Sequence, residues 1–165
     1  MIEIGARRCF PTMLAAGDPV PEFRGTTASG TPISTETLTG HPTVLYFYPK
    51  AGSYGCTRES VEFARYFEEF HARGVEIVGV SIDSTEEQKR FAESCSLPFP
   101  LLADPGGDVA RKFGVLGAFG FARRVTFLIL PNGRIGDVVV SPLPGPHIRR
   151  AREFFSPTAS PAPSV

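Results

Sequence analysis

The sequence predicts an α/β domain in which helices flank a central mixed β-sheet, with a β-hairpin near the N-terminus. Residues 43–48 are apolar on both faces, which is typical of a strand in the middle of a covered sheet. Helical and strand periodicities then alternate along the chain, as in α/β proteins. Residues 125–130 and 135–140 flank the turn Asn132-Gly133, a strong hairpin signal.

The first half of the chain supplies the N-terminal hairpin and the first β-α-β unit. Residues 22–27 and 31–34 are separated by Ala-Ser-Gly, which predicts a short hairpin. After the strand 43–48, apolar residues at intervals of three and four predict a helix from Thr57 to about Arg73. Residues 75–82 follow as a second core strand.

The second half completes the sheet and its cover. Right-handed crossovers would make the first two core strands parallel, and the closing hairpin would add antiparallel strands. This order predicts a thioredoxin-like fold. The remaining predicted elements are a helix at 86–94 capped by Asp83-Ser84-Thr85, an extended segment at 97–102, a short helix at 109–113, a Gly/Phe-rich loop at 114–122 and a helix at 148–155.

The 165 residues are enough for one domain with a substantial core. We place this domain at residues 18–155. Residues 1–17 show no clear period and are expected to form an N-terminal extension. Residues 156–165 are rich in Pro, Ser and Ala and are expected to be a disordered tail.

Composition excludes several classes of protein. The 17 basic and 17 acidic residues balance to a formal net charge of zero, so we expect neither a nucleic-acid partner nor attachment to a membrane. No apolar run is long enough to cross a bilayer, and no signal peptide is evident. The three histidines are far apart without ligand-like spacing, so no metal or other cofactor is expected.

Three cysteines, Cys9, Cys56 and Cys95, form no Cys-x-x-Cys pair, and their odd number argues against a disulfide scaffold. A reducing compartment, and therefore a cytoplasmic location, fits this pattern. Cys56 follows a strand and a Pro/Gly-rich loop and stands where a helix begins. The unpaired N–H groups of a helix N-terminus favour a reactive thiolate there. Taken alone, however, a cysteine is more often a small buried hydrophobe than a reactive thiol, and Cys56 without its loop would be interpreted that way.

The residues around Cys56 resemble a known family. Pro49-x-x-x-Ser53-x-x-Cys56 is similar to the peroxiredoxin active-site motif Pro-x-x-x-Thr/Ser-x-x-Cys. The flanking residues 45–50 and 55–59 resemble the peroxiredoxin Q, or bacterioferritin-comigratory, subfamily. The similarity continues through residues 78–81, 99–104 and 124–129 and covers about residues 17–155.

The resemblance implies a role for each residue of the motif. Cys56 would attack a peroxide oxygen as a thiolate, and the guanidinium of Arg124 would stabilise the thiolate and hold the peroxide. The Ser53 hydroxyl would orient the peroxide, and Pro49 would shield the thiolate from water. Simpler interpretations exist: Ser53 could serve only the turn, and Pro49 also ends a strand.

Arg123 and Arg124 are adjacent and would point to opposite faces of a strand, so one of them could be merely solvated. The spacing before Thr126-Phe127 selects Arg124. Glu59 would suit the helix dipole in a first helical turn, and the resemblance implies that it also holds an arginine.

The resemblance also bears on how the cycle closes. Val61 stands where many relatives carry the resolving cysteine, so a local disulfide is impossible. Other relatives carry that cysteine on the helix after the second core strand, and Cys95 lies about one turn beyond that position. We expect Cys95 to resolve through an intramolecular disulfide, with Cys9 or an external thiol as the alternatives.

The sequence therefore predicts a peroxiredoxin, an antioxidant thiol-dependent peroxidase that reduces hydrogen peroxide and organic hydroperoxides. A thioredoxin- or glutaredoxin-like donor would recycle it, and the resemblance suggests a monomer. The alternatives are a slow-turnover redox-sensing or binding module, a one-Cys peroxidase, and a structural thioredoxin-fold protein with an inert Cys56.

Overall fold

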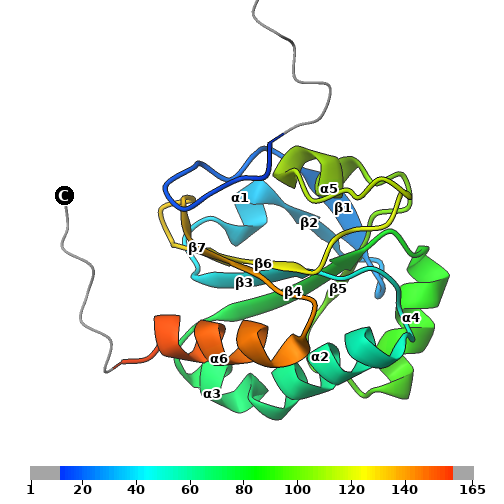
Figure 1. Ribbon diagram of the computed structural model, residues 1–165. Coiled ribbons are helices and arrows are strands. Elements are labelled where there is room, and N and C mark those ends of the chain that lie inside the picture. The colour runs from blue at the N-terminus through cyan, green and yellow to red at the C-terminus, as the bar shows by residue number, and fades with distance from the viewer. Residues whose placement is uncertain (1–11, 158–165) are drawn as a thin grey trace, which may run out of the picture.

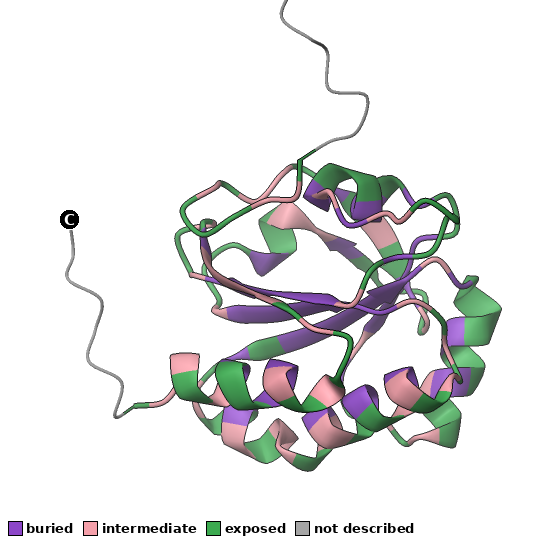
Figure 2. Ribbon diagram, in the orientation of Figure 1, coloured by how far each residue is buried: buried purple, intermediate pink, exposed green. Residues whose placement is uncertain are grey.

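The structure, a computed structural model, describes residues 12–157 (Figure 1). Cys9, most of the predicted extension and nearly all of the predicted tail lie outside the described residues. Two layers of helices enclose one twisted sheet, and purple, buried strands run through its centre (Figure 2).

The sheet has seven strands in the order β2-β1-β5-β4-β3-β6-β7. The three central strands β3, β4 and β5 are parallel, and β6, β7, β1 and β2 add antiparallel pairs on both sides. The mixed sheet and its N-terminal hairpin agree with the prediction. The strands are β1 Arg24–Thr27, β2 Pro32–Ser34, β3 Thr43–Phe47, β4 Glu76–Ser81, β5 Leu101–Ala103, β6 Val125–Ile129 and β7 Ile135–Val140.

The helices divide between the two faces of the sheet (Figure 1). On one face α1 and α5 cover a core built around Phe23, Phe47, Phe113 and Phe127. On the other face α2, α3 and α6 lie below the sheet, and α4 contributes Phe91 to the same core. The helices are α1 Thr35–Leu38, α2 Tyr54–Arg65, α3 Phe67–Ala72, α4 Thr85–Ser94, α5 Asp108–Phe113 and α6 Pro144–Phe154.

The helix predicted from Thr57 to Arg73 is instead two helices, α2 and α3, separated at Tyr66. The Tyr66 backbone (φ −101°, ψ 11°) leaves the helical range, and its ring packs beneath the Arg152 guanidinium, 3.9 Å from the ring centroid. This contact comes from α6, a distant segment, and therefore leaves no local signal in the sequence.

Helix α6 also begins four residues earlier than predicted. Pro144 stands at its first turn, where a proline costs no hydrogen bond because those N–H groups are unpaired in any helix. Helix α1, of four residues, lies between the N-terminal hairpin and β3, where the sequence predicted no helix.

Residues 12–17 were predicted to belong to an extension, but they pack on the domain. The Leu14 amide donates to the Phe113 carbonyl (3.2 Å), and the Gly17 amide donates to the Ile135 carbonyl (2.7 Å). Met13 and Leu14 also pack against the core of the α1/α5 face. The boundary at residue 18 is therefore too late, because apolar contacts without any regular period hold this segment in place.

Candidate active site

Cys56 lies inside the first turn of α2, because the helix begins at Tyr54 rather than at Thr57 as predicted. Ser53 is the N-cap residue, and its carbonyl accepts from the Thr57 amide (2.8 Å). The sulfur-bearing residue is fully buried. The thiol therefore sits among the unpaired amides and the partial positive charge of a helix N-terminus.

Arg124 immediately precedes β6, and its side chain reaches the Cys56 thiol. Its Nη2 donates to Cys56 Sγ at 3.3 Å, and its Nη1 donates to Glu59 Oε1 at 2.8 Å. The Arg124 side chain is only 10% exposed, whereas its neighbour Arg123 is exposed. A cation held this close stabilises negative charge on sulfur more strongly than it could in water.

Gly55 makes this close approach possible. A Cβ atom added at Gly55 would lie 3.0 Å from Arg124 Nη2, tighter than nearly all real Cβ contacts. The residue before the cysteine is therefore limited in size by the guanidinium. Sequence reasoning missed this role, because Gly55 read only as part of a Gly-rich loop.

Glu59 was predicted in the first turn of α2, but it lies in the second turn and is completely buried. Burial raises the pKa of Glu59 from its ordinary value of 4.5 to about 7, although Arg124 acts to lower it. We conclude that desolvation outweighs the ion pair, since Oε2 of this carboxyl has no hydrogen-bond partner among the described residues.

His147 of α6 borders the same carboxyl, with Nδ1 3.8 Å from Glu59 Oε2. Burial lowers the pKa of His147, which favours the neutral ring. Nε2–H then donates to the Ser141 carbonyl (2.9 Å), and Nδ1 accepts from the Thr126 hydroxyl (2.8 Å). Three elements of the fold thus enclose the base of the site: α2, β6 and α6.

The other two residues of the motif occupy different positions. Pro49 shares the lining of a cavity of about 450 Å³ with Arg124 and with residues that follow β7; its lining also includes Arg123, Val140, Ser141 and Pro142. Ser53 Oγ donates to the Lys50 carbonyl (2.9 Å) within the loop. Pro49 and Arg124 therefore line the same cavity, whereas the Ser53 hydroxyl is hydrogen-bonded within its own loop.

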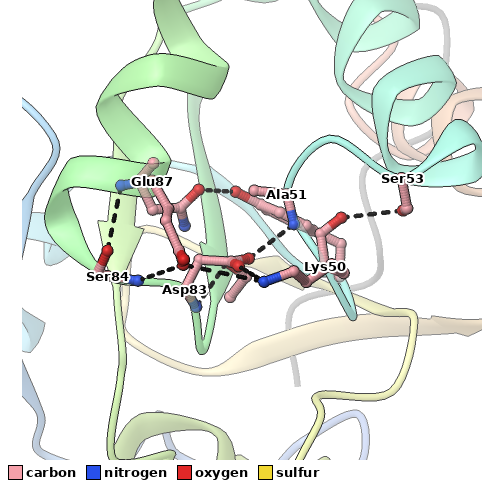
Figure 3. A network of polar contacts seen from close by, with 9 residues as sticks. Lys50, Ala51, Ser53, Asp83, Ser84 and Glu87 are labelled. Atoms are coloured by element: carbon pink, nitrogen blue, oxygen red, sulfur yellow. Dashed lines mark hydrogen bonds and ion pairs between the residues drawn. The ribbon is translucent and has the colours of Figure 1, made fainter.

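The loop before α2 is tied to the N-terminus of α4 (Figure 3). The Asp83 carboxylate accepts from Lys50 Nζ (2.9 Å) and from the Ala51 amide (2.7 Å). The sequence predicted Asp83 only as part of a helix cap; in the structure Ser84 is the N-cap of α4, in a reciprocal pair with Glu87. Asp83 is thus free to bind the loop.

Cys95 lies in a different setting from Cys56. It is the C-cap residue of α4, half-buried, and its Sγ lies 3.8 Å from Ser94 Oγ. Cys56 and Cys95 are both free thiols. Val61, where many relatives are expected to carry a resolving cysteine, is 44% exposed on α2.

Within residues 12–157 no three His, Cys, Asp or Glu side chains gather as metal ligands would. Over the same range no helix combines the length and apolar character that crossing a bilayer requires.

Comparison with known proteins identifies the family. Residues 16–138 match the AhpC/TSA family. The chain belongs to the AhpC/TSA family. It is similar to chloroplastic peroxiredoxin Q from Sedum lineare, with 39% identity over 71% of this chain and 64% of the relative. It is 35% identical to peroxiredoxin Bcp from Escherichia coli, over 76% of this chain and 85% of the relative.

Solved structures support the same assignment. Peroxidoxin BcpB from Mycobacterium tuberculosis superposes with a TM-score of 0.82 and 34% identity, covering 89% of this chain and 99% of that one. Peroxiredoxin Q from Xanthomonas campestris gives a TM-score of 0.79 and 26% identity, over 90% and 98%. The predicted thioredoxin-like fold and the resemblance to the peroxiredoxin Q/Bcp subfamily are confirmed.

As a member of the AhpC/TSA family with peroxiredoxin relatives, the chain is a thiol-dependent peroxidase, an oxidoreductase. Its relatives in plants are longer, since the chain spans 64% of the Sedum lineare protein. The individual roles of Cys56, Ser53, Arg124, Pro49 and Cys95 are predictions that the family match does not test.

Proposed function

We propose that Cys56 reduces hydrogen peroxide and small organic hydroperoxides as a thiolate. The observation that carries this proposal is the 3.3 Å contact between Arg124 Nη2 and the buried Cys56 Sγ in the first turn of α2. A guanidinium and a helix N-terminus act on one sulfur atom, and an inert structural cysteine has no need of either.

The proposed first step is a nucleophilic displacement at oxygen. Cys56 Sγ attacks one peroxide oxygen, the S–O bond forms as the O–O bond breaks, and sulfur loses two electrons to become a sulfenic acid. The other oxygen leaves as hydroxide or alkoxide and takes up a proton from water. The guanidinium of Arg124 would stabilise the negative charge that develops on the leaving oxygen.

The cavity of about 450 Å³ beside Pro49 and Arg124 is the proposed site for the peroxide. Its lining combines a charged group with apolar side chains such as Val140 and Pro142, which suits a polar O–O group that carries a small organic substituent. Pro49 would exclude water from one side. The Ser53 hydroxyl would have to exchange its bond to Lys50 for the peroxide.

We propose that Cys95 completes the cycle. Its thiol would condense with the Cys56 sulfenic acid, forming the S–S bond and releasing water. Because Cys56 is buried and a disulfide needs Cα atoms within about 7 Å, the first turn of α2 must unwind for this step. A thioredoxin- or glutaredoxin-like dithiol of the cytoplasm would then reduce the disulfide, with the monomer as the acting unit.

The test is one equivalent of hydrogen peroxide added to fully reduced protein, followed by peptide mapping. We expect rapid loss of the Cys56 thiol and a Cys56–Cys95 disulfide, with no fast peroxide consumption by Cys56→Ser. Survival of the Cys56 thiol would refute the proposed chemistry. Loss of the Cys56 thiol without a Cys56–Cys95 disulfide would refute only the proposed role of Cys95 and would favour an external thiol.

Repeated turnover separates an enzyme from a redox sensor. With thioredoxin, its reductase and NADPH, we expect sustained peroxide consumption. A single oxidation that thioredoxin does not reverse would favour the slow-turnover sensing module instead.

A further inference from the structure

The Asp83 carboxylate is buried and satisfied by three donors. It lies two residues beyond the end of β4, and its side chain is 1% exposed. It accepts from Lys50 Nζ, the Ala51 amide and the Ser81 hydroxyl at 2.7–2.9 Å (Figure 3). Burial by itself would raise the pKa of Asp83, but the hydrogen bonds from Ser81, Ala51 and Lys50 hold it below its usual value. Asp83 is therefore an ionised, fixed acceptor.

Two of these three donors belong to the loop that leads into α2. Ala51 lies five residues before Cys56, so its amide is fixed to the end of β4 just ahead of the reactive turn. Lys50 adds a second, charged bond, and its Nζ also lies 3.9 Å from Glu87 of α4. The upstream side of the catalytic loop is thus held at two successive residues.

Immediately after Ala51 the backbone adopts a positive φ angle at Gly52. Gly52 has φ +81°, a value that L-residues other than glycine rarely adopt, and a Cβ added there would meet nothing within 4 Å. A cavity of about 400 Å³ opens beside residues 50–52 and extends along α4 to Ser94, the neighbour of Cys95. The chain therefore passes from a fixed residue to a conformationally free one beside open space that extends to Ser94, the residue before Cys95.

We propose that Asp83 is a positioning residue for the peroxidase reaction. By fixing Ala51 it keeps residues 54–56 in the helical conformation that holds Cys56 Sγ against Arg124. Gly52 is the hinge about which that segment departs when the thiol is oxidised, while Ala51 stays in place. This inference rests on the proposed function of Cys56 and adds to it the group that holds the reactive conformation.

The test compares Asp83→Asn and Asp83→Ala with Asp108→Ala, all in a Cys95→Ser background so that the sulfenic acid persists. Asp108 is the matched control, since it is an exposed aspartate whose side chain pairs with Arg111 within α5. Two quantities are measured: the rate constant for Cys56 oxidation by hydrogen peroxide, and the rate at which a 1,3-diketone labels the resulting sulfenic acid.

We expect Asp83→Ala to slow oxidation about tenfold, because a small misplacement of a reacting group has a large effect on rate. Labelling should roughly double in rate, because a loosened turn opens more often. Asp83→Asn, which keeps an acceptor oxygen for the Ala51 amide, should fall between Asp83→Ala and the control. Positioning by Asp83 predicts slower oxidation of Cys56 together with faster labelling of its sulfenic acid. A general loss of stability would not change the two rates in opposite directions.

Equal oxidation rates in Asp83→Ala and Asp108→Ala would overturn the proposal. If Asp83→Ala does not fold, Asp83→Asn and Lys50→Met decide the question by the same two rates, and rates equal to the control in both would overturn it. Failure of the Cys95→Ser parent to react with peroxide would instead show that the proposed function is wrong, and this inference would fall with it.

Discussion

Cys56 and Cys95, the two cysteines within residues 12–157 of this peroxiredoxin, occupy opposite kinds of environment. Cys56 is fully buried in the first turn of α2, with a guanidinium fixed 3.3 Å from its sulfur. Cys95 is half-buried at the end of α4, where its sulfur lies 3.8 Å from Ser94 Oγ. Ser96, next in the chain, has φ +49°, which is strained for a residue other than glycine.

The difference separates what each step of the proposed cycle requires. Attack on a peroxide needs donors that are already in place when charge develops, and these are found at Cys56. Disulfide formation needs one chain segment to reach another, and helix ends are where a backbone opens at the least cost in free energy. Both thiols lie at helix ends, but only Cys56 is buried against fixed donors, and in the proposed cycle its turn of α2 opens to reach the more exposed Cys95.

The largest effect on Cys56 is expected from removing the guanidinium that contacts its sulfur. We expect Arg124→Ala to lower the rate constant for Cys56 oxidation by roughly 10²–10³, as loss of one transition-state donor does in other enzymes. Stopped-flow measurement of first-turnover peroxide consumption checks this. Arg65→Ala is the matched control, since Arg65 is an exposed arginine at the end of α2 that lies far from Cys56 along the helix. A similar loss in both variants would contradict the role of Arg124.

The buried environment can be tested through pH. Because the pKa of Glu59 is raised to about 7, the folded state holds a proton that the unfolded state releases above about 4.5. Glu59 therefore favours folding at low pH, and this contribution is lost as pH rises to about 7. Relative to Glu59→Gln, the wild type should lose up to about 3 kcal/mol of stability over that range.

Urea denaturation of both proteins at about pH 5 and about pH 8 measures this difference. Burial lowers the pKa of the neighbouring His147, which destabilises the folded state as pH falls, and the comparison with Glu59→Gln subtracts the part of this effect that does not depend on the Glu59 carboxylate. Parallel pH dependences of the two proteins would show that Glu59 is not desolvated as the structure describes.

The other half of the comparison concerns Cys95, the less buried of the two thiols. We expect Cys95→Ser to leave the first turnover unchanged and to slow thioredoxin-supported cycling about tenfold, by analogy with the loss of other groups that act in a single step. The reductase-coupled assay reports cycling, and single-turnover kinetics report the first step. Unimpaired cycling would mean that an external thiol, or Cys9, reduces the sulfenic acid.

The smallest effect is expected from crowding the guanidinium. Gly55→Ala would place a Cβ 3.0 Å from Arg124 Nη2, and the ion pair to Glu59 limits how far the side chain can retreat. We expect a roughly fivefold slower oxidation of Cys56 through this displacement. Gly145→Ala is the control, because it also lies in the first turn of a helix but meets nothing within 4 Å. Equal rates in the two variants would show that Arg124 adjusts freely.

Much of this protein could be predicted because its signals are local. The strands, the N-terminal hairpin and the Asn132-Gly133 turn follow from side-chain periodicity and turn chemistry. The spacing of Pro49, Ser53 and Cys56 within one loop is enough to indicate the family. The break at Tyr66 and the packing of Met13 and Leu14 were missed, because each depends on a distant part of the chain.

The sequence by itself thus determined the fold class and the family and pointed to Cys56 as the candidate reactive cysteine, because these reside in patterns a few residues long. The resemblance pointed to Arg124 as a partner of that cysteine, whereas only the tertiary structure gave the distances, the burial and the contact of Asp83 with the loop. Arg124 is 68 residues from Cys56, and Asp83 is 32 residues from Ala51, yet each makes a direct hydrogen bond across that interval. Such contacts arise when strand order brings β6 beside β3 and the end of β4 beside the catalytic loop, and no local pattern encodes that arrangement.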